Sequence, residues 1–169
     1  ADRARSCRKQ PGWVLGAAEG HDHNIVSMMP SLTSLIARET GPRALARAGV
    51  SHDDIDLTMV YDSFTYTVLL TLEALGFCGP GEAPDFVAGQ RTAPGGDFPL
   101  NTNGGGLSYT HPGMYGIFLL VEAVRQLRGE CGDRQVRHRQ DPSQAAKVAL
   151  VNGTGGSLSS TGTVVLATI

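Results

Sequence analysis

Short apolar runs of the kind that form buried strands alternate along this chain with segments of helical spacing, and two β-rich segments end it. This alternation predicts an α/β layered domain with a mixed sheet, because apolar strands and helices must cover one another in layers. The two final segments predict a terminal hairpin. The expected strands are residues 13–20, 55–61, 147–153 and 161–168, and the expected helices are residues 39–49, 63–79 and 116–130.

Composition limits the classes of partner. A length of 169 residues suffices for one domain with a core, and 41% hydrophobic with 18% charged residues is typical of a globular protein. The formal net charge is −2 and the basic residues are scattered, which argues against nucleic acid as the main partner. No apolar run reaches the ~18 residues of a membrane span, and no secretory signal is visible.

Cysteine and histidine usage bears on compartment and metals. The three cysteines are odd in number and lack CxxC spacing, so we expect no disulfide framework or zinc knuckle, and a cytoplasmic location. His21, Asp22 and His23 could supply metal ligands. Three adjacent residues on one short segment rarely converge on one ion, so we favour a solvated loop and expect no metal. Neither a GxGxxG after a strand nor a GKS/GKT sequence occurs, so we expect no nucleotide cofactor.

Three segments follow expected strands or flank expected helices: VYDSF (60–64), and the glycine-rich GGGLSYTHPGMYG (104–116) and VNGTGG (151–156). In α/β sheets, ligands bind at the carboxyl ends of strands. The Gly/Pro-rich stretch 79–101 is long for a loop inside a compact domain, and such loops are usually functional or mobile. We therefore expect these segments to form a ligand site.

The three segments resemble, in order and approximate spacing, the C-terminal half of a thiolase. The family patterns are N-E-A-F, N-x-x-G-G-x-x-x-x-G-H-P and C-x-G-G, and this chain has YDSF (61–64), NTNGGGLSYTHP (101–112) and NGTGG (152–156). The resemblance is greatest to the lipid-transfer-protein branch, the SCP2-thiolase-like proteins. It implies a mixed, mostly parallel five-stranded sheet with helices on both faces.

The resemblance also implies how the chain is organised. Residues 1–169 would be the thiolase C-terminal domain, with the N-terminal half of the family fold absent. Residues 1–11, which begin without an initiator Met, would be the tail of a preceding segment. The family's nucleophilic cysteine would lie in the absent half.

Two departures from the family patterns bear on the reaction. We expect the second reactive cysteine, the first residue of C-x-G-G, to fall at Asn152, whose amide cannot shuttle a proton. Tyr61 replaces the asparagine of N-E-A-F. The combination resembles the steroid side-chain aldolases of this branch, and implies retro-aldol cleavage of a bulky, possibly steroidal, β-hydroxyacyl-CoA. The alternatives are acetyl-CoA acyltransferase activity, or a non-catalytic module that binds lipid or acyl-CoA.

His111 is the main candidate for catalysis. The resemblance implies that its Nε2–H donates to the thioester carbonyl oxygen, where negative charge develops. The alternative is a histidine bonded to nearby backbone in a glycine-rich turn. Tyr61 would act as a general acid/base or orient a partner by a hydrogen bond, unless it is an ordinary strand-end tyrosine. Tyr115 and Tyr109 are rivals for that role, whereas Tyr66 is expected to pack on its helix.

The remaining candidates would bind substrate. Asn103, Gly104, Gly105 and Gly106 could line the acyl or pantetheine channel, or simply form a tight turn. Asp62 could orient a partner, although an Asp at a helix start usually caps its own helix. Asn152 and Gly153 could contact substrate or just finish a strand.

The resemblance also carries expectations about ligands and partners. The CoA thioester is the substrate, and no separate cofactor is expected. The family implies a homodimer. The aldolases of this branch imply a small partner chain with an OB-fold and a zinc ribbon.

Overall fold

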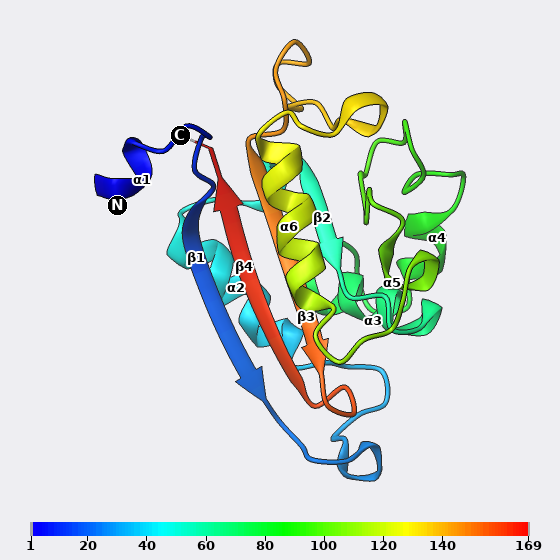
Figure 1. The fold of residues 1–169 in the computed structure, drawn as a ribbon. Helices are drawn as coiled ribbons and strands as arrows, with labels where there is room; N and C mark the ends of the chain where they lie inside the picture. Colours follow the sequence, from blue (N-terminus) through cyan, green and yellow to red (C-terminus); the bar gives the residue numbers. More distant parts are fainter. Residues whose placement is uncertain (1, 169) are drawn as a thin grey trace.

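Four strands form one mixed sheet with helices on both faces in the structure, a computed structural model that describes residues 2–168 (Figure 1). The order across the sheet is β1-β4-β3-β2. β4 is antiparallel to both of its neighbours, and β2 is parallel to β3. The strands are β1 (Trp13–His21), β2 (Leu57–Val60), β3 (Val148–Gly155) and β4 (Ser160–Ala167).

The expected α/β class, helices on both faces and terminal hairpin are confirmed, but the five-stranded, mostly parallel sheet is wrong. Between residues 2 and 168 the sheet has four strands, and β2–β3 is its one parallel pair. The β3–β4 hairpin places β4 between β3 and β1, so both ladders of β4 are antiparallel. Beside β2, the stretch before residue 101 makes only an isolated parallel bridge, between Thr58 and Leu100.

Three longer helices cover the sheet. α2 (Ala37–Ala48) and α3 (Thr65–Leu75) pack on one face, and α6 (Gly116–Leu127) packs on the other (Figure 1). α2 ends at Gly49 and α3 at Gly76, both in the left-handed conformation that glycine accepts at a helix C-terminus. The shorter helices are α1 (Asp2–Arg5), α4 (Ala83–Val87) and α5 (Gly105–Ser108), with 3-10 turns at Val26–Met28, His52–Asp54 and Gly132–Arg134.

Strand alternation divides the core into two apolar clusters. On the α6 face, Leu57, Met59 and Tyr61 pack with Val151 and Leu119. On the other face, the cluster includes Val60, Leu150 and Val165 of the strands with α2 and α3 side chains such as Leu45 and Leu70. Residues next to one another on a strand therefore face different layers, which matters for the site below. In the described part of the chain, no helix is long and apolar enough to cross a membrane.

Candidate active site

Tyr61 and His111 meet where β2 ends. Tyr61 directly follows β2, and its N–H donates to the Asn152 carbonyl at 3.0 Å, which continues the β2–β3 ladder by one bond. His111 lies in the loop between α5 and α6. The Tyr61 hydroxyl is 3.0 Å from Nδ1 of His111 and 3.5 Å from the Pro112 carbonyl oxygen. The fold thus brings together two of the predicted catalytic residues.

This contact favours one tautomer of the imidazole. The phenol has one proton to donate, and the Nδ1 atom of His111 is its nearer acceptor. A phenol that donates to Nδ1 leaves the ring proton on Nε2. Since the His111 residue is exposed, an Nε2–H group is available to a substrate oxygen. Phe64 lies beside the imidazole, with 6.2 Å between the ring centroids.

Tyr115 completes a stack of aromatic rings. It immediately precedes α6, is 1% exposed, and stacks on Tyr61 with 5.3 Å between centroids and an interplanar angle of 27°. Its hydroxyl is 3.5 Å from Nδ2 of Asn103. Burial raises the pKa of both Tyr61 and Tyr115 above the ordinary value, and the nearby charge of Asp62 raises each further. Both side chains are therefore neutral phenols at pH 7.

Asp62 does not cap its own helix, so that expectation is wrong. Its buried carboxylate accepts hydrogen bonds from the N–H groups of Gly106, at 2.6 Å, and Leu107, at 3.1 Å. Those amides belong to α5, whereas α3 begins after Phe64 without a side-chain cap. At Gly105, φ is +73° and a Cβ atom would collide with the Asp62 carboxylate. Asp62 therefore ties the glycine-rich turn to the end of β2.

Asn103 also shapes this turn. Its Oδ1 atom accepts a hydrogen bond from the Gly105 N–H at 3.0 Å, and its Nδ2 atom faces the Tyr115 hydroxyl. Gly104 has φ +97° and is exposed, whereas Gly105 is buried. Of the expected channel residues, Asn103 and Gly104 remain open to a ligand, and Gly105 fixes the backbone.

An ion pair between the buried Glu122 and the partly exposed Arg134 was not predicted from the sequence. Glu122 of α6 is 3% exposed and binds Arg134 through two contacts of 3.1 and 3.0 Å, while the Thr102 hydroxyl donates to it at 2.9 Å. Burial alone would raise the pKa of Glu122, but the hydrogen bonds from Arg134, Thr102 and Gln126 lower it below the ordinary value. The signal was a carboxylate on the apolar side of an amphipathic helix, where an unpaired charge is costly.

Asn152 is not at the site. Its side chain is fully buried, and its Nδ2 donates to the hydroxyls of Thr161 and Thr163 at 2.9 and 2.8 Å. Because its strand neighbour Val151 faces α6, the Asn152 side chain faces the α2 layer, on the other side of the sheet from Tyr61. The predicted contact between its side chain and substrate is therefore wrong.

The assignment of the missing cysteine to Asn152 also needs correction. The C-x-G-G pattern ends on two glycines, and with Gly155 and Gly156 in those places its first position is Gly153. Gly153 lies on the α6 face, where a Cβ atom would be 3.9 Å from the Cα of Gly116. The residue at the position of the reactive cysteine therefore has no side chain at all.

Tyr109 is 65% exposed and lines a small pocket together with Asn103 and Tyr115. The remaining candidates lie apart from this site. The Tyr66 hydroxyl donates to the Leu32 carbonyl at 2.7 Å. His21 contacts Ser160, and the buried His23 contacts Asp22 and the Ser157 carbonyl. Within residues 2–168, no group of three or more His, Cys, Asp or Glu side chains is placed to hold a metal ion.

Comparison with known proteins identifies related sequences. Residues 18–168 match the family model described as thiolase C-terminal domain-like. The chain is 41% identical over 136 residues to a 17-hydroxy-3-oxo-4-pregnene-20-carboxyl-CoA lyase of Mycobacterium tuberculosis, covering 76% of this chain and 34% of that protein. It is 37% identical over 161 residues to a steroid side-chain-cleaving aldolase of Thermomonospora curvata, covering 91% of this chain and 38% of that protein. The chain thus spans little more than a third of these relatives.

Two solved structures have similar folds. The Ltp2-ChsH2(DUF35) aldolase superposes with a TM-score of 0.80 and 32% identity, over 99% of this chain and 42% of that one. A monomeric SCP2-thiolase like protein of Mycobacterium smegmatis superposes with a TM-score of 0.66 and 21% identity, over 94% of this chain and 29% of that one. The second likeness concerns the fold alone.

Proposed function

Since this chain belongs to the thiolase C-terminal domain-like family, in its SCP2-thiolase branch, we propose that the enzyme containing it is an acyl-CoA aldolase. It would cleave the bond between Cα and Cβ of a bulky β-hydroxyacyl-CoA, with a steroid as the favoured acyl group. Relatives at 37–41% identity are named as a steroid side-chain-cleaving aldolase and a steroid-CoA lyase, which supports this reaction class.

The proposal rests mainly on one observation: glycine, at position 153, stands where the thiolase pattern has its second reactive cysteine. Acetyl transfer by a thiolase uses a second cysteine to move a proton to and from the substrate α-carbon, and glycine offers no group for that step. A retro-aldol cleavage needs no second thiol. It needs an acceptor for the β-hydroxyl proton, a donor for the thioester oxygen and an acid for Cα, and the cluster of Tyr61, His111 and Tyr115 at the end of β2 has groups of the last two kinds.

His111 supplies the donor. When the Cα–Cβ bond breaks, its electron pair passes into the thioester and negative charge collects on the carbonyl oxygen. An Nε2–H group aimed at that oxygen lowers the barrier by about 3 kcal/mol in comparable oxyanion sites. The Tyr61 hydroxyl holds the imidazole ring through Nδ1, so we propose that the role of Tyr61 is to orient His111.

Tyr115 supplies the proton for Cα. Burial raises its pKa, so the group rests as a phenol and is suited to donate rather than to accept. Among residues 2–168, the Tyr115 hydroxyl has one side-chain hydrogen bond, the 3.5 Å contact with Asn103, whereas the Tyr61 hydroxyl is engaged by His111. Over one turnover the β-hydroxyl loses its proton to solvent as the new carbonyl forms, Cα gains a proton from Tyr115, and solvent returns a proton to the Tyr115 phenolate, so the protons balance.

The CoA arm and the partner chains are also proposals. Asn103 and Gly104 are open to the pantetheine arm of the substrate. The reaction needs no coenzyme other than the CoA that the substrate itself carries. The solved aldolase is named as a complex of Ltp2 with ChsH2(DUF35), which supports a small partner chain here, of the OB-fold and zinc-ribbon type. The family resemblance favours a homodimer. The three free cysteines are compatible with a cytoplasmic location.

The test is an assay of the complete enzyme with a steroidal β-hydroxyacyl-CoA, following release of the ketone or aldehyde. His111→Ala should reduce kcat by about 100-fold or more. Undiminished turnover by this variant would remove His111 from the mechanism. Thiolysis of acetoacetyl-CoA at a rate comparable with aldol cleavage would favour the acyltransferase, and acyl-CoA binding without turnover would favour a binding module.

A further inference from the structure

The Asp62 carboxylate fixes the path of the glycine-rich turn at residues 104–107. Its Oδ1 and Oδ2 atoms accept the N–H groups of Gly106 and Leu107, and Oδ1 of Asn103 accepts the N–H group of Gly105. Three successive amides of the turn are therefore bonded to side chains. Because Asp62 is 4% exposed, its charge depends on these bonds for compensation. The turn is thus held in one position relative to the end of β2.

The same turn packs against both tyrosine rings of the site. A Cβ atom added to Gly106 would lie 3.5 Å from Cε1 of Tyr115 and 3.5 Å from Cε2 of Tyr61. It would also lie 3.1 Å from Oδ1 of Asp62. Gly106 therefore fills the space between the two rings and the carboxylate. The turn also begins the segment that reaches His111 five residues later. A shift of the turn would disturb both rings and the segment that carries the imidazole.

We infer that Asp62 is a positioning residue of the aldolase reaction. Its carboxylate is bonded inside the protein, and it acts by holding the turn against the rings of Tyr61 and Tyr115. The Tyr61 hydroxyl then stays at the imidazole of His111, and the Tyr115 hydroxyl stays beside the Asn103 amide. The inference rests on the proposed function and adds to it a residue that acts through the other three.

The charge of Asp62 also favours the protonated form of both phenols. Burial is the main cause of the raised pKa of Tyr61 and of Tyr115, and the nearby Asp62 carboxylate raises each pKa further. A negative charge beside a phenol disfavours the phenolate. The other ionisable side chains near the rings are His111, Glu122 and Tyr109. Of these groups within residues 2–168, Asp62 alone raises the pKa of both tyrosines.

The alternative is a purely structural role, in which Asp62 stabilises the fold and has no separate effect on the reaction. Asp56 allows the two roles to be separated. It directly precedes β2, is 1% exposed, and accepts hydrogen bonds from backbone N–H groups. Those groups belong to Arg139, Lys147 and Val148, at 2.7, 2.8 and 3.1 Å. Asp56 thus makes the same kind of contact at the other end of the strand, away from the tyrosines.

Asp62→Asn and Asp56→Asn compare the two aspartates in the complete enzyme. Asparagine keeps one oxygen acceptor but loses the second acceptor and the charge, so both variants should unfold at lower urea concentration than wild type. Where all three proteins are folded, Asp62→Asn should lower kcat for a steroidal β-hydroxyacyl-CoA by about tenfold, with KM changed by less than about twofold. Asp56→Asn should keep the wild-type kcat. Wild-type kcat in Asp62→Asn, or equal losses in both variants, would overturn the inference.

Gly106→Ala tests the packing of the turn without changing the charge, and it decides the question if Asp62→Asn does not fold. The new methyl group would crowd the Asp62 carboxylate and contact both rings, so kcat should fall by about fivefold or more. Gly12→Ala is the control, because its Cβ atom would make an ordinary contact of 3.4 Å with Val124. It should keep the wild-type kcat. Wild-type kcat in Gly106→Ala would overturn the inference.

A measurement without turnover separates this inference from the aldolase proposal. In protein with isotopically labelled tyrosine, NMR at Cζ follows each phenol, and Tyr61→Phe and Tyr115→Phe assign the two resonances. The pKa of both tyrosines should be lower in Asp62→Asn than in wild type, and unchanged in Asp56→Asn. If wild type cleaves no β-hydroxyacyl-CoA but these values fall, the aldolase proposal fails and the coupling of Asp62 to the rings stands. Tyrosine resonances that neither move nor titrate differently in Asp62→Asn would overturn the inference.

Discussion

The Tyr61 hydroxyl lies 3.0 Å from Nδ1 of His111, across 50 residues of sequence. Tyr61 occupies the place of an asparagine in the thiolase pattern. The hydrogen bond leaves Nε2 as the donor that faces outward, so the two residues form one functional unit.

Tyr61→Phe should separate orientation from proton transfer. It removes the hydrogen bond to Nδ1 and keeps the ring that stacks on Tyr115, so kcat should fall about five- to tenfold, which corresponds to about 1 kcal/mol, with little change in KM. Tyr66→Phe is the control and should leave kcat unchanged, since the Tyr66 hydroxyl donates to the Leu32 carbonyl, away from Tyr61 and His111. A Tyr61→Phe enzyme as active as wild type would contradict the orienting role.

Tyr115→Phe should have a larger effect on kcat, about 100-fold or more, because it removes the proposed acid. The pH profile tests the same assignment. The folded pKa of Tyr115 is raised, so its acid form persists up to that pKa and is lost only as the pH rises through it. Activity that depends on Tyr115 should therefore not decline between pH 8 and about pH 9.5. If wild-type activity declines between pH 8 and about pH 9.5 and the Tyr115→Phe variant shows no such decline, the pKa of Tyr115 is not raised.

Glu122→Gln should destabilise the fold at neutral pH by roughly 1–3 kcal/mol, since it leaves Arg134 without its ionic partner. The folded pKa of Glu122 is lowered, so the ionised group stabilises the fold above its unfolded pKa of about 4.3. That contribution is lost as the pH falls through the folded pKa. Urea unfolding should therefore show a difference from wild type that shrinks below about pH 4. Glu39→Gln, at an exposed site, is the control, and a difference independent of pH would rule out the ion pair as its source.

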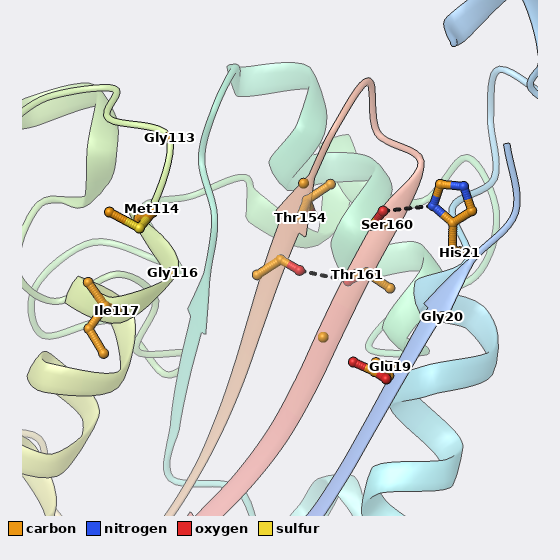
Figure 2. A pocket seen from close by; sticks show the side chains of 13 residues that line it. Glu19, Gly20, His21, Gly113, Met114, Gly116, Ile117, Thr154, Ser160 and Thr161 are labelled. Atoms are coloured by element: carbon orange, nitrogen blue, oxygen red, sulfur yellow. Dashed lines mark hydrogen bonds between the residues drawn. The ribbon is translucent and has the colours of Figure 1, made fainter. Parts of the chain in front are cut away.

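Gly153→Cys and Asn152→Cys should differ in thiol reactivity, although the residues are adjacent. A thiol at position 153 would point into the open groove beside the start of α6 (Figure 2). A thiol at position 152 would be enclosed with Thr161 and Thr163. Titration of the folded protein with a thiol reagent should find one more reactive cysteine in Gly153→Cys than in wild type. In Asn152→Cys it should find the same number as in wild type. Reaction of both variants at equal rates would show that the facing of β3 is not as described.

The secondary structure could be predicted from the sequence because the patterns that determine it are local. The helix that ends at Gly49, the strand that precedes Tyr61 and the two final strands all follow from apolar spacing and from glycine at helix ends. The order of the strands in the sheet could not be predicted in this way, because it depends on contacts between distant parts of the chain. The position of β4 between β1 and β3 depends on pairing between strands at opposite ends of the chain.

Residue type and motif order alone determined the identity of the main candidates, His111, Tyr61 and Tyr115, and the family in which they occur. The tertiary structure decided which of their neighbours share the site. Asn152 and Gly153 are equivalent candidates in the sequence, but a strand turns adjacent side chains to opposite faces. Gly153 therefore faces α6, next to Gly116, whereas the Asn152 side chain is buried on the other face. Asp62 likewise caps α5 rather than its own helix, because the close approach of Gly105 and Gly106 is a contact between segments some 44 residues apart.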